Sequence, residues 1–205
     1  GDKTISAGYA KLLELFTHEY FHAWWVKRVK PSVFIPYDLT QETYTNLLWV
    51  FEGFTSYYDA LLTARSGATD TESYLKSLSE TLNRHYLGSA KNRQSLAESS
   101  FDAWIKYYKV RTNRSRSVTS YYDKGALVAM ALDAFIQKES AGKHSLDDVL
   151  RYAWQQFKEV GKDYAGIDEE MMPELIFEAT GIDVSEKIDR WVYGCEEPDY
   201  KRVLK

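Results

Sequence analysis

The chain has 205 residues, of which 44% are apolar, 27% charged and 15% aromatic. This composition fits a folded globular domain and excludes an intrinsically disordered chain. The net charge of −4 argues against nucleic acid as a partner.

The sequence also bears on covalent cross-links and on membrane association. Cys195 is the single cysteine, so no intramolecular disulfide can form. No apolar run is long enough to cross a bilayer, and the chain does not open with a secretory signal pattern. We therefore expect a soluble protein, cytoplasmic or periplasmic, with no membrane partner. The run 111–116 is basic although the net charge of the chain is negative, and we interpret this run as a solvated loop.

Helical periodicity dominates the chain, and no segment reads as a strand. The apolar spacing predicts a first helix over 6–30 that Pro31 ends, and an irregular connection over 31–41. A second helix is expected over 43–65, with Gly67 as its C-cap. Further helices are predicted over 71–86, 101–108, 121–139, 145–161, 170–179 and 185–192. The expected fold is mostly α, a single domain of packed helices over 1–205.

The most informative segment is His18-Glu19-Tyr20-Phe21-His22. On a helix, His18 and His22 lie one turn apart on the same face, so both rings can reach one metal ion. Glu19 projects beside that ion without binding it, where a general base would take a proton from water. The alternative interpretation is a surface helix whose histidines have no function. We interpret His85 and His144 as ordinary surface histidines.

A third metal ligand is needed, and Glu52 is the candidate because it lies in an apolar segment after the chain has turned back. A carboxylate buried there would need a cation as partner. Gly53 supports this interpretation, since a glycine inside a helix is costly unless another element approaches closely. The competing interpretation of Glu52 is a half-exposed surface carboxylate.

A hydrogen-bond donor for the oxyanion of peptide hydrolysis could come from Tyr121 or Tyr122, at the start of the helix predicted over 121–139. With 16 tyrosines in the chain, a core or surface tyrosine is the favoured interpretation from these residues alone.

Three segments together resemble a known family. Residues 18–31 read HEYFHAWWVKRVKP, residues 49–58 read WVFEGFTSYY, and residues 120–133 read SYYDKGALVAMALD. They closely resemble the glycyl aminopeptidases, family sixty-one of the metallopeptidases. That family belongs to the gluzincins, the thermolysin-like zinc peptidases whose third ligand is a glutamate. The resemblance implies that this chain is the helical catalytic lobe of such a peptidase.

Position by position, the resemblance implies one Zn²⁺ held by His18, His22 and Glu52, with Glu19 as general base. It favours Tyr122 over Tyr121 as the donor to the transition state. The implied reaction is hydrolysis of peptide substrates, by an aminopeptidase that prefers an N-terminal glycine or alanine. The alternative is a helical binding or scaffold module in which zinc is structural or absent.

The sequence departs from the family pattern at two positions near the motif. Position 25 is Trp where the family usually has Asn, so packing is expected to replace a polar contact. Ser56 lies where thermolysin-like enzymes often carry a carboxylate that orients a histidine. Support for His18 must therefore come from a hydroxyl or from another residue.

Family members carry further parts that we do not find in this chain: an N-terminal β domain, a β lobe and often a C-terminal PDZ domain. We therefore expect little or no activity from the chain alone. We also expect an apolar exposed face where the β lobe would dock, and this face could support a homodimer.

Overall fold

The computed structural model describes residues 6–88, 93–107 and 118–203. Within these ranges the regular structure is helical, and β-type pairing is confined to two isolated bridges. The mostly α fold is therefore confirmed. The basic run 111–116 lies outside the described residues. None of the described helices combines the length and the apolar character that a membrane span requires.

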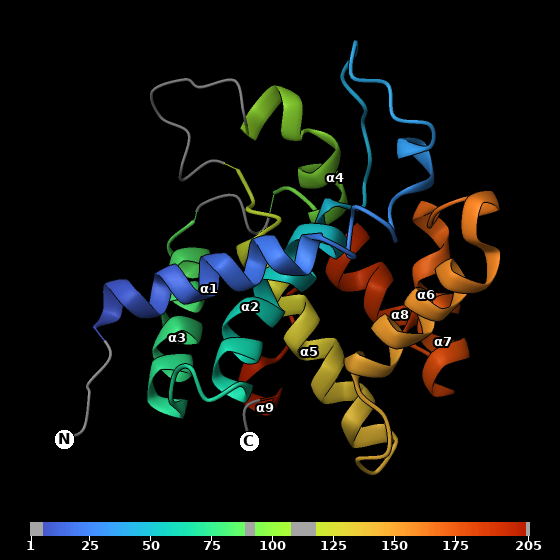
Figure 1. Ribbon diagram of the computed structural model, residues 1–205. Coiled ribbons are helices and arrows are strands. Elements are labelled where there is room, and N and C mark those ends of the chain that lie inside the picture. Colours follow the sequence, from blue (N-terminus) through green and yellow to red (C-terminus); the bar gives the residue numbers. More distant parts are fainter. Residues whose placement is uncertain (1–5, 89–92, 108–117, 204–205) are drawn as a thin grey trace.

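The α-helices follow one another along the chain with several short 3₁₀ or π turns between them (Figure 1). They are α1 (Ala7–His22), α2 (Phe54–Arg65), α3 (Thr71–Leu87), α4 (Leu96–Phe101), α5 (Asp123–Glu139), α6 (Leu146–Val160), α7 (Met172–Thr180), α8 (Ser185–Ile188) and α9 (Tyr200–Val203). The π turns are η2 (Trp49–Gly53), η3 (Ala103–Tyr107) and η6 (Asp189–Tyr193), and the 3₁₀ turns are η1 (Ser32–Phe34), η4 (Gly161–Asp163) and η5 (Glu169–Met171).

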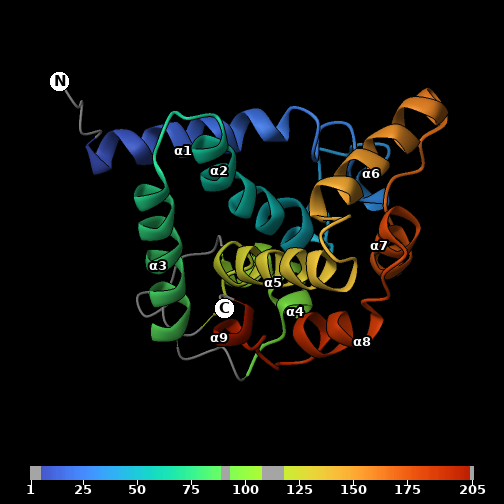
Figure 2. The ribbon, with the colours of Figure 1, turned by 90° about the horizontal axis from the view of Figure 1, so that it is seen from below.

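Helix α5 forms the centre of the fold, because every residue from 124 to 133 is buried. A helix buried on all sides must be covered by other elements all round. In Figure 2, α2 lies between α1 and α5, while α3 covers one side of α5 and α6 and α7 lie toward the other. The site-bearing helices therefore rest on a rigid, fully packed support.

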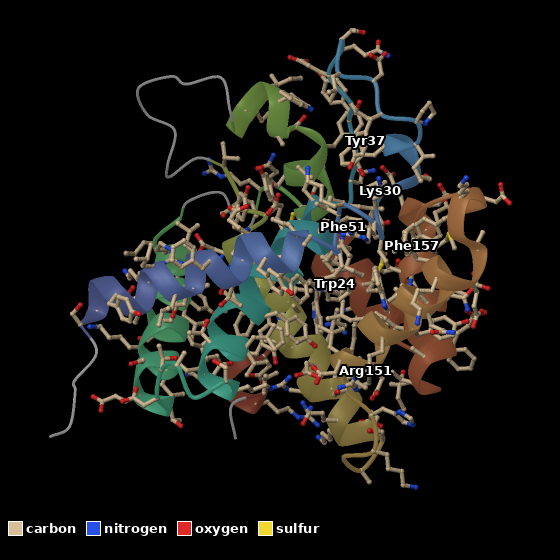
Figure 3. The ribbon with its side chains drawn as sticks, in the orientation of Figure 1. Trp24, Lys30, Tyr37, Phe51, Arg151 and Phe157 are labelled. Carbon is tan, nitrogen blue, oxygen red and sulfur yellow. The ribbon has the colours of Figure 1, made fainter. Side chains whose placement is uncertain are left out.

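The first helix is shorter than predicted, because α1 ends at His22 and not at residue 30. The chain then coils through a backbone with a positive φ of 97° at Val26, which is rare for a β-branched residue. This coil buries Trp25 and Val29 completely in the core. It also places the ring centre of Trp24 6.0 Å from that of Trp154 in α6, the helix that carries Arg151 and Phe157 (Figure 3). Burial of these side chains outweighs the preference for a continuous helix.

The second predicted helix begins later than expected, at Trp49 instead of residue 43. Its end at Arg65 is confirmed, and Gly67 follows with a positive φ of 76°, as a C-cap glycine should. The later helices agree with the predicted spans to within a few residues. The exception is the segment predicted as one helix over 101–108, where α4 begins at Leu96 and η3 follows.

Gly53 is needed for a close approach between η2 and α5. A Cβ atom built on Gly53 would lie 2.6 Å from the Cα atom of Gly125. A Cβ atom on Gly125 would lie 2.8 Å from the Cα atom of Gly53. The two backbones touch directly, and only glycine permits this on either side. The expectation that another helix approaches Gly53 is confirmed.

The two other histidines differ from each other. His144 has a side chain that is 42% exposed, as expected for a surface histidine. The prediction for His85 is wrong, because its side chain is only 4% exposed and its Nε2 lies 3.0 Å from Oε2 of Glu197. A distant segment of the chain covers this histidine, and no local sequence pattern indicated that pairing.

Candidate metal centre

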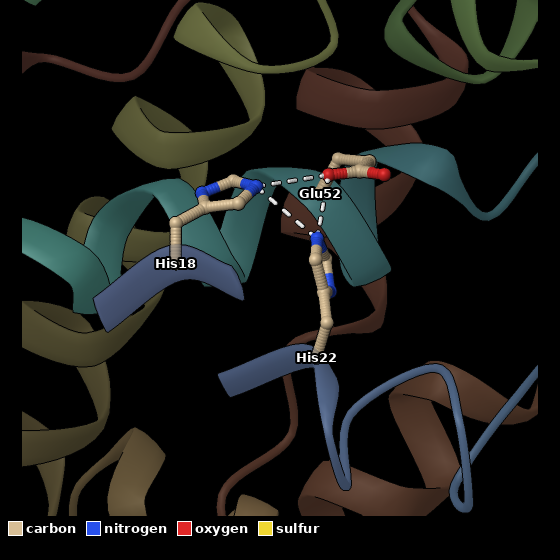
Figure 4. Close-up of side chains that lie close together, drawn as sticks. All are labelled: His18, His22 and Glu52. Carbon is tan, nitrogen blue, oxygen red and sulfur yellow. Dashed lines mark hydrogen bonds and ion pairs between the residues drawn. The ribbon is translucent and has the colours of Figure 1, made fainter. Parts of the chain in front are cut away.

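His18 and His22 lie one turn apart on α1, which Ser6 caps by accepting a hydrogen bond from the backbone of Tyr9. Their rings face the carboxylate of Glu52, which η2 carries to the same point (Figure 4). The two Nε2 atoms are 3.1 Å apart. Oε2 of Glu52 lies 3.3 Å from Nε2 of His18 and 3.2 Å from Nε2 of His22. The three predicted ligands therefore meet in the structure.

The outer nitrogen of each ring already has a partner. Nδ1 of His18 lies 3.1 Å from Oδ2 of Asp59, and Nδ1 of His22 lies 3.1 Å from the carbonyl oxygen of Trp25. Both partners accept, so each Nδ1 carries a hydrogen, and in the neutral ring Nε2 is left with its lone pair. Two lone pairs and a carboxylate then converge on one point. Such a cluster of acceptors requires a cation or a proton between them.

The spacing of the three atoms fits zinc. Zinc–ligand bonds of about 2.0–2.2 Å in a tetrahedron place neighbouring ligand atoms about 3.3–3.6 Å apart. The observed separations of 3.1–3.3 Å lie at or just below the short end of this range. Within the described part of the chain, this is the group of metal-ligating side chains that meets at a common point. Two imidazoles and a carboxylate are also a common donor set for zinc.

The electrostatics of the centre favour positive charge. Burial by itself would lower the pKa of His18, but the hydrogen bonds with Asp59 and Glu52 raise it to about 9. Burial would raise the pKa of Glu52, whereas the hydrogen bonds with His18 and His22 lower it to about 2. Without metal, a proton on His18 offsets one of the two carboxylate charges of Asp59 and Glu52. A metal ion must displace that proton to bind.

Asp59 is the residue that the sequence interpretation missed. It lies on α2 two turns beyond Glu52, on the same face, and it meets His18 directly. The sequence interpretation considered Ser56, one turn beyond Glu52, whereas Asp59 lies on the next turn. A carboxylate two turns after the third ligand was the available signal.

Trp25 connects the two ligand-bearing segments. Its carbonyl oxygen holds His22, and its indole N–H donates to the carbonyl oxygen of Val50 in η2 at 3.2 Å. Its ring lies 5.0 Å from that of Phe51. The side chain at position 25 therefore packs as expected and also makes a polar contact. This bridge fixes His22 relative to the turn that carries Glu52.

The two proposed catalytic side chains differ in exposure. Glu19 is exposed on α1 beside His18. Tyr122 is the N-cap residue of α5 and is partly exposed, with its ring centre 6.3 Å from that of His18. Tyr121 is completely buried. Of the two tyrosines, Tyr122 is therefore the one with access to the site.

The chain is similar to known proteins in both sequence and structure. The model of the M61 glycyl aminopeptidases matches residues 11–128, more than half of the chain and the whole of the centre described above. The solved structures include an aminopeptidase N family protein from Idiomarina loihiensis that is 38% identical, with a TM-score of 0.91. The alignment covers 99% of this chain and 34% of that protein, so the chain spans about a third of its length. The curated proteins include no significant match. The chain belongs to the M61 glycyl aminopeptidase family.

Proposed function

We propose that this chain carries the catalytic centre of a zinc-dependent aminopeptidase that removes small N-terminal residues, glycine or alanine, from peptides. One observation carries the proposal: three acceptor atoms on His18, His22 and Glu52 converge on a common point, and the exposed Glu19 follows His18 on the same helix. Family membership supports the peptidase class. The preference for small residues rests on the resemblance to the glycyl aminopeptidases.

A zinc ion held by the three ligands would polarise the scissile carbonyl and make a water molecule more acidic. Glu19 would accept a proton from the attacking water and later pass it to the leaving amine. An exposed carboxylate on the same helix as the two histidines has the freedom to perform both transfers. Asp59 holds His18 in the ring orientation and tautomer that leave Nε2 directed at the centre.

Tyr122 stabilises the negative charge that develops on the substrate oxygen. A phenol at the start of a helix beside the centre can donate a hydrogen bond to that oxygen. The backbone of α5 supports this position, because the helix behind Tyr122 is buried on all sides. The tyrosine therefore immediately precedes a helix whose residues 124–133 are all buried.

We further propose that the chain alone binds zinc but turns over substrate slowly. Positioning of the substrate supplies much of the rate of an enzyme, and the chain spans only a third of the similar structure. One face of α1 exposes several large apolar side chains: Tyr9, Leu12, Leu15, Phe16 and Tyr20. Such a face supports contact with a further lobe of the protein, or with a second copy of this chain.

The test is Glu19→Gln in the full-length protein, assayed on glycine and alanine anilides. The variant should bind one zinc per chain, as the wild type does, and lose nearly all turnover because the general base is gone. His22→Ala is the matched control on the same helix, and it should lose zinc as well as activity. Unchanged turnover in Glu19→Gln would remove Glu19 as the base.

The competing function is a helical scaffold with structural zinc. Structural zinc sites usually have four protein ligands, whereas three residues meet within the described part of this chain. Tight zinc binding without any hydrolysis of peptides by the full-length wild type would favour the scaffold.

A further inference from the structure

Three consecutive residues at the start of α5 each contact a different part of the fold. Asp123 accepts hydrogen bonds from the guanidinium of Arg84 in α3, at 2.8 and 3.0 Å. Lys124 pairs with Glu197 in the segment before α9. Gly125 touches Gly53 of η2, the residue next to Glu52. Tyr122 comes immediately before these three residues.

The Lys124 contact is unusual, because a lysine with no exposed side-chain surface meets a carboxylate whose side chain is only 20% exposed. The side chain of Lys124 is 0% exposed, and its Nζ lies 3.6 Å from Oε1 of Glu197. The other oxygen of Glu197 lies 3.0 Å from Nε2 of His85 and accepts a hydrogen bond from Tyr200 at 3.3 Å. Three elements, α3, α5 and the segment 194–203, therefore meet around one carboxylate.

Burial by itself would raise the pKa of Glu197, but the hydrogen bond with His85 and the charge of Lys124 lower it. The glutamate is therefore ionised beside the lysine. A buried ion pair of this kind is weak evidence for stability, because apolar residues of similar volume often do as well. Its better-attested use is to fix one arrangement of the elements that it joins.

We propose that Lys124 and Glu197 are positioning residues that hold Tyr122 in its place beside the metal centre. The contact of Gly125 with Gly53 sets the distance between α5 and the turn that carries Glu52. The pairing of Lys124 with Glu197 fixes how the first turn of α5 is rotated about its axis. Because Tyr122 is two residues before Lys124, that rotation decides whether its phenol faces the centre. This inference rests on the proposed function.

The positioning role is tested by comparing Lys124→Met, Glu197→Gln and the double variant in the full-length, zinc-loaded protein. A small displacement of Tyr122 acts on the transition state, so kcat should fall roughly 10- to 100-fold. KM should stay within about twofold, because substrate binding in the ground state does not use the phenol. Zinc content should remain one per chain. The double variant should lose no more than the worse single variant, since both act through one contact.

Asp133→Asn is the matched control. Asp133 is also a buried charged residue of α5, and it accepts hydrogen bonds from Tyr57 and from the backbone of Leu146. It lies more than two turns from Tyr122, so its loss should lower the melting temperature without changing kcat below that temperature. A phosphinic dipeptide, which resembles the transition state, should bind the Lys124 and Glu197 variants more weakly by the same factor as their loss in kcat.

The outcomes separate the two proposals. A zinc-loaded wild type without turnover would reject the proposed function. An active wild type whose folded Lys124→Met and Glu197→Gln variants keep full kcat would overturn the positioning role. So would variants in which zinc content and KM change together with kcat, because that pattern indicates a purely structural contact. If Lys124→Met does not fold, Glu197→Gln decides the question from the other end of the pair.

Discussion

Asp59 accepts a hydrogen bond from Nδ1 of His18 at 3.1 Å, two helical turns beyond the third proposed ligand, Glu52. One face of α2 and the turn before it therefore supply both a ligand and the carboxylate that orients another ligand. Burial raises the pKa of Asp59, and its hydrogen bond with His18 opposes that rise. In the proposed metal centre, the ring of His18 therefore lies between two carboxylates: Glu52 at Nε2 and Asp59 at Nδ1.

Replacing Asp59 with alanine should weaken zinc binding roughly 10- to 100-fold, because His18 loses the partner that fixes its ring and tautomer. Competition with a chelator of known affinity measures this directly. Ser56→Ala, one turn earlier on the same helix, should leave the zinc affinity unchanged. Equal losses in both variants would show that the effect does not come from the contact with His18.

Zinc should stabilise the folded chain, because the three ligand atoms meet only in the native state. At about 100 times its dissociation constant, zinc should add about 2.7 kcal/mol to the free energy of unfolding. For a chain of this size, that raises Tm by roughly 2–4 °C per kcal/mol. Thermal unfolding with and without zinc measures the shift, which Glu52→Gln should largely remove. A full shift in that variant would place the metal elsewhere.

Tyr122→Phe should lower kcat roughly 100- to 1000-fold in the full-length enzyme, with little change in KM, because a donor to the developing oxyanion is removed. Tyr121→Phe is the control, since Tyr121 is completely buried and should affect stability alone. Steady-state kinetics on glycine and alanine anilides distinguish the two. The reverse result would assign the role to Tyr121.

Gly53→Ala should destabilise the fold by about 1–3 kcal/mol, because the added methyl group would overlap the backbone of Gly125. Gly8→Ala on α1 is the control, since a Cβ atom there meets nothing within 4 Å. That substitution should stabilise the chain slightly, as alanine favours helices. Urea unfolding measures both changes, and an equally small effect at Gly53 would contradict the close approach.

Asp147 should make stability sensitive to acid. Burial by itself would raise its pKa, but hydrogen bonds from Tyr58 and Arg65 lower it below the ordinary value of 3.8. A lowered pKa stabilises the native state above that ordinary value, and this contribution is lost as the pH falls further. Asp147→Asn should therefore be less stable than the wild type at neutral pH. The difference should shrink at about pH 3.

Urea unfolding at the two pH values tests this, with Asp163→Asn in η4 as an exposed control. A difference between wild type and Asp147→Asn that grew on acidification would reverse the assigned sign.

Local patterns along the chain were enough to predict the helical class and the three side chains that meet at the proposed centre. The spacing of His18 and His22 on one helix requires no knowledge of the fold, because the helical period alone puts both rings on one face. The glycine at position 67 and the capping serine at position 145 likewise act through neighbouring backbone, so α2 ends and α6 begins where the local signals indicate.

Which distant groups meet depends on how the helices pack against one another. The end of α1 at His22 follows from the burial of Trp25 and Val29, a packing gain that no local propensity contains. The pairing of His85 with Glu197 joins residues more than a hundred positions apart, so periodicity could not reveal it. Asp59 meets His18 only because α1 and α2 pack together. Helix propensity and capping act between residues that are close in sequence. Burial and charge pairing act between whichever segments the fold brings into contact.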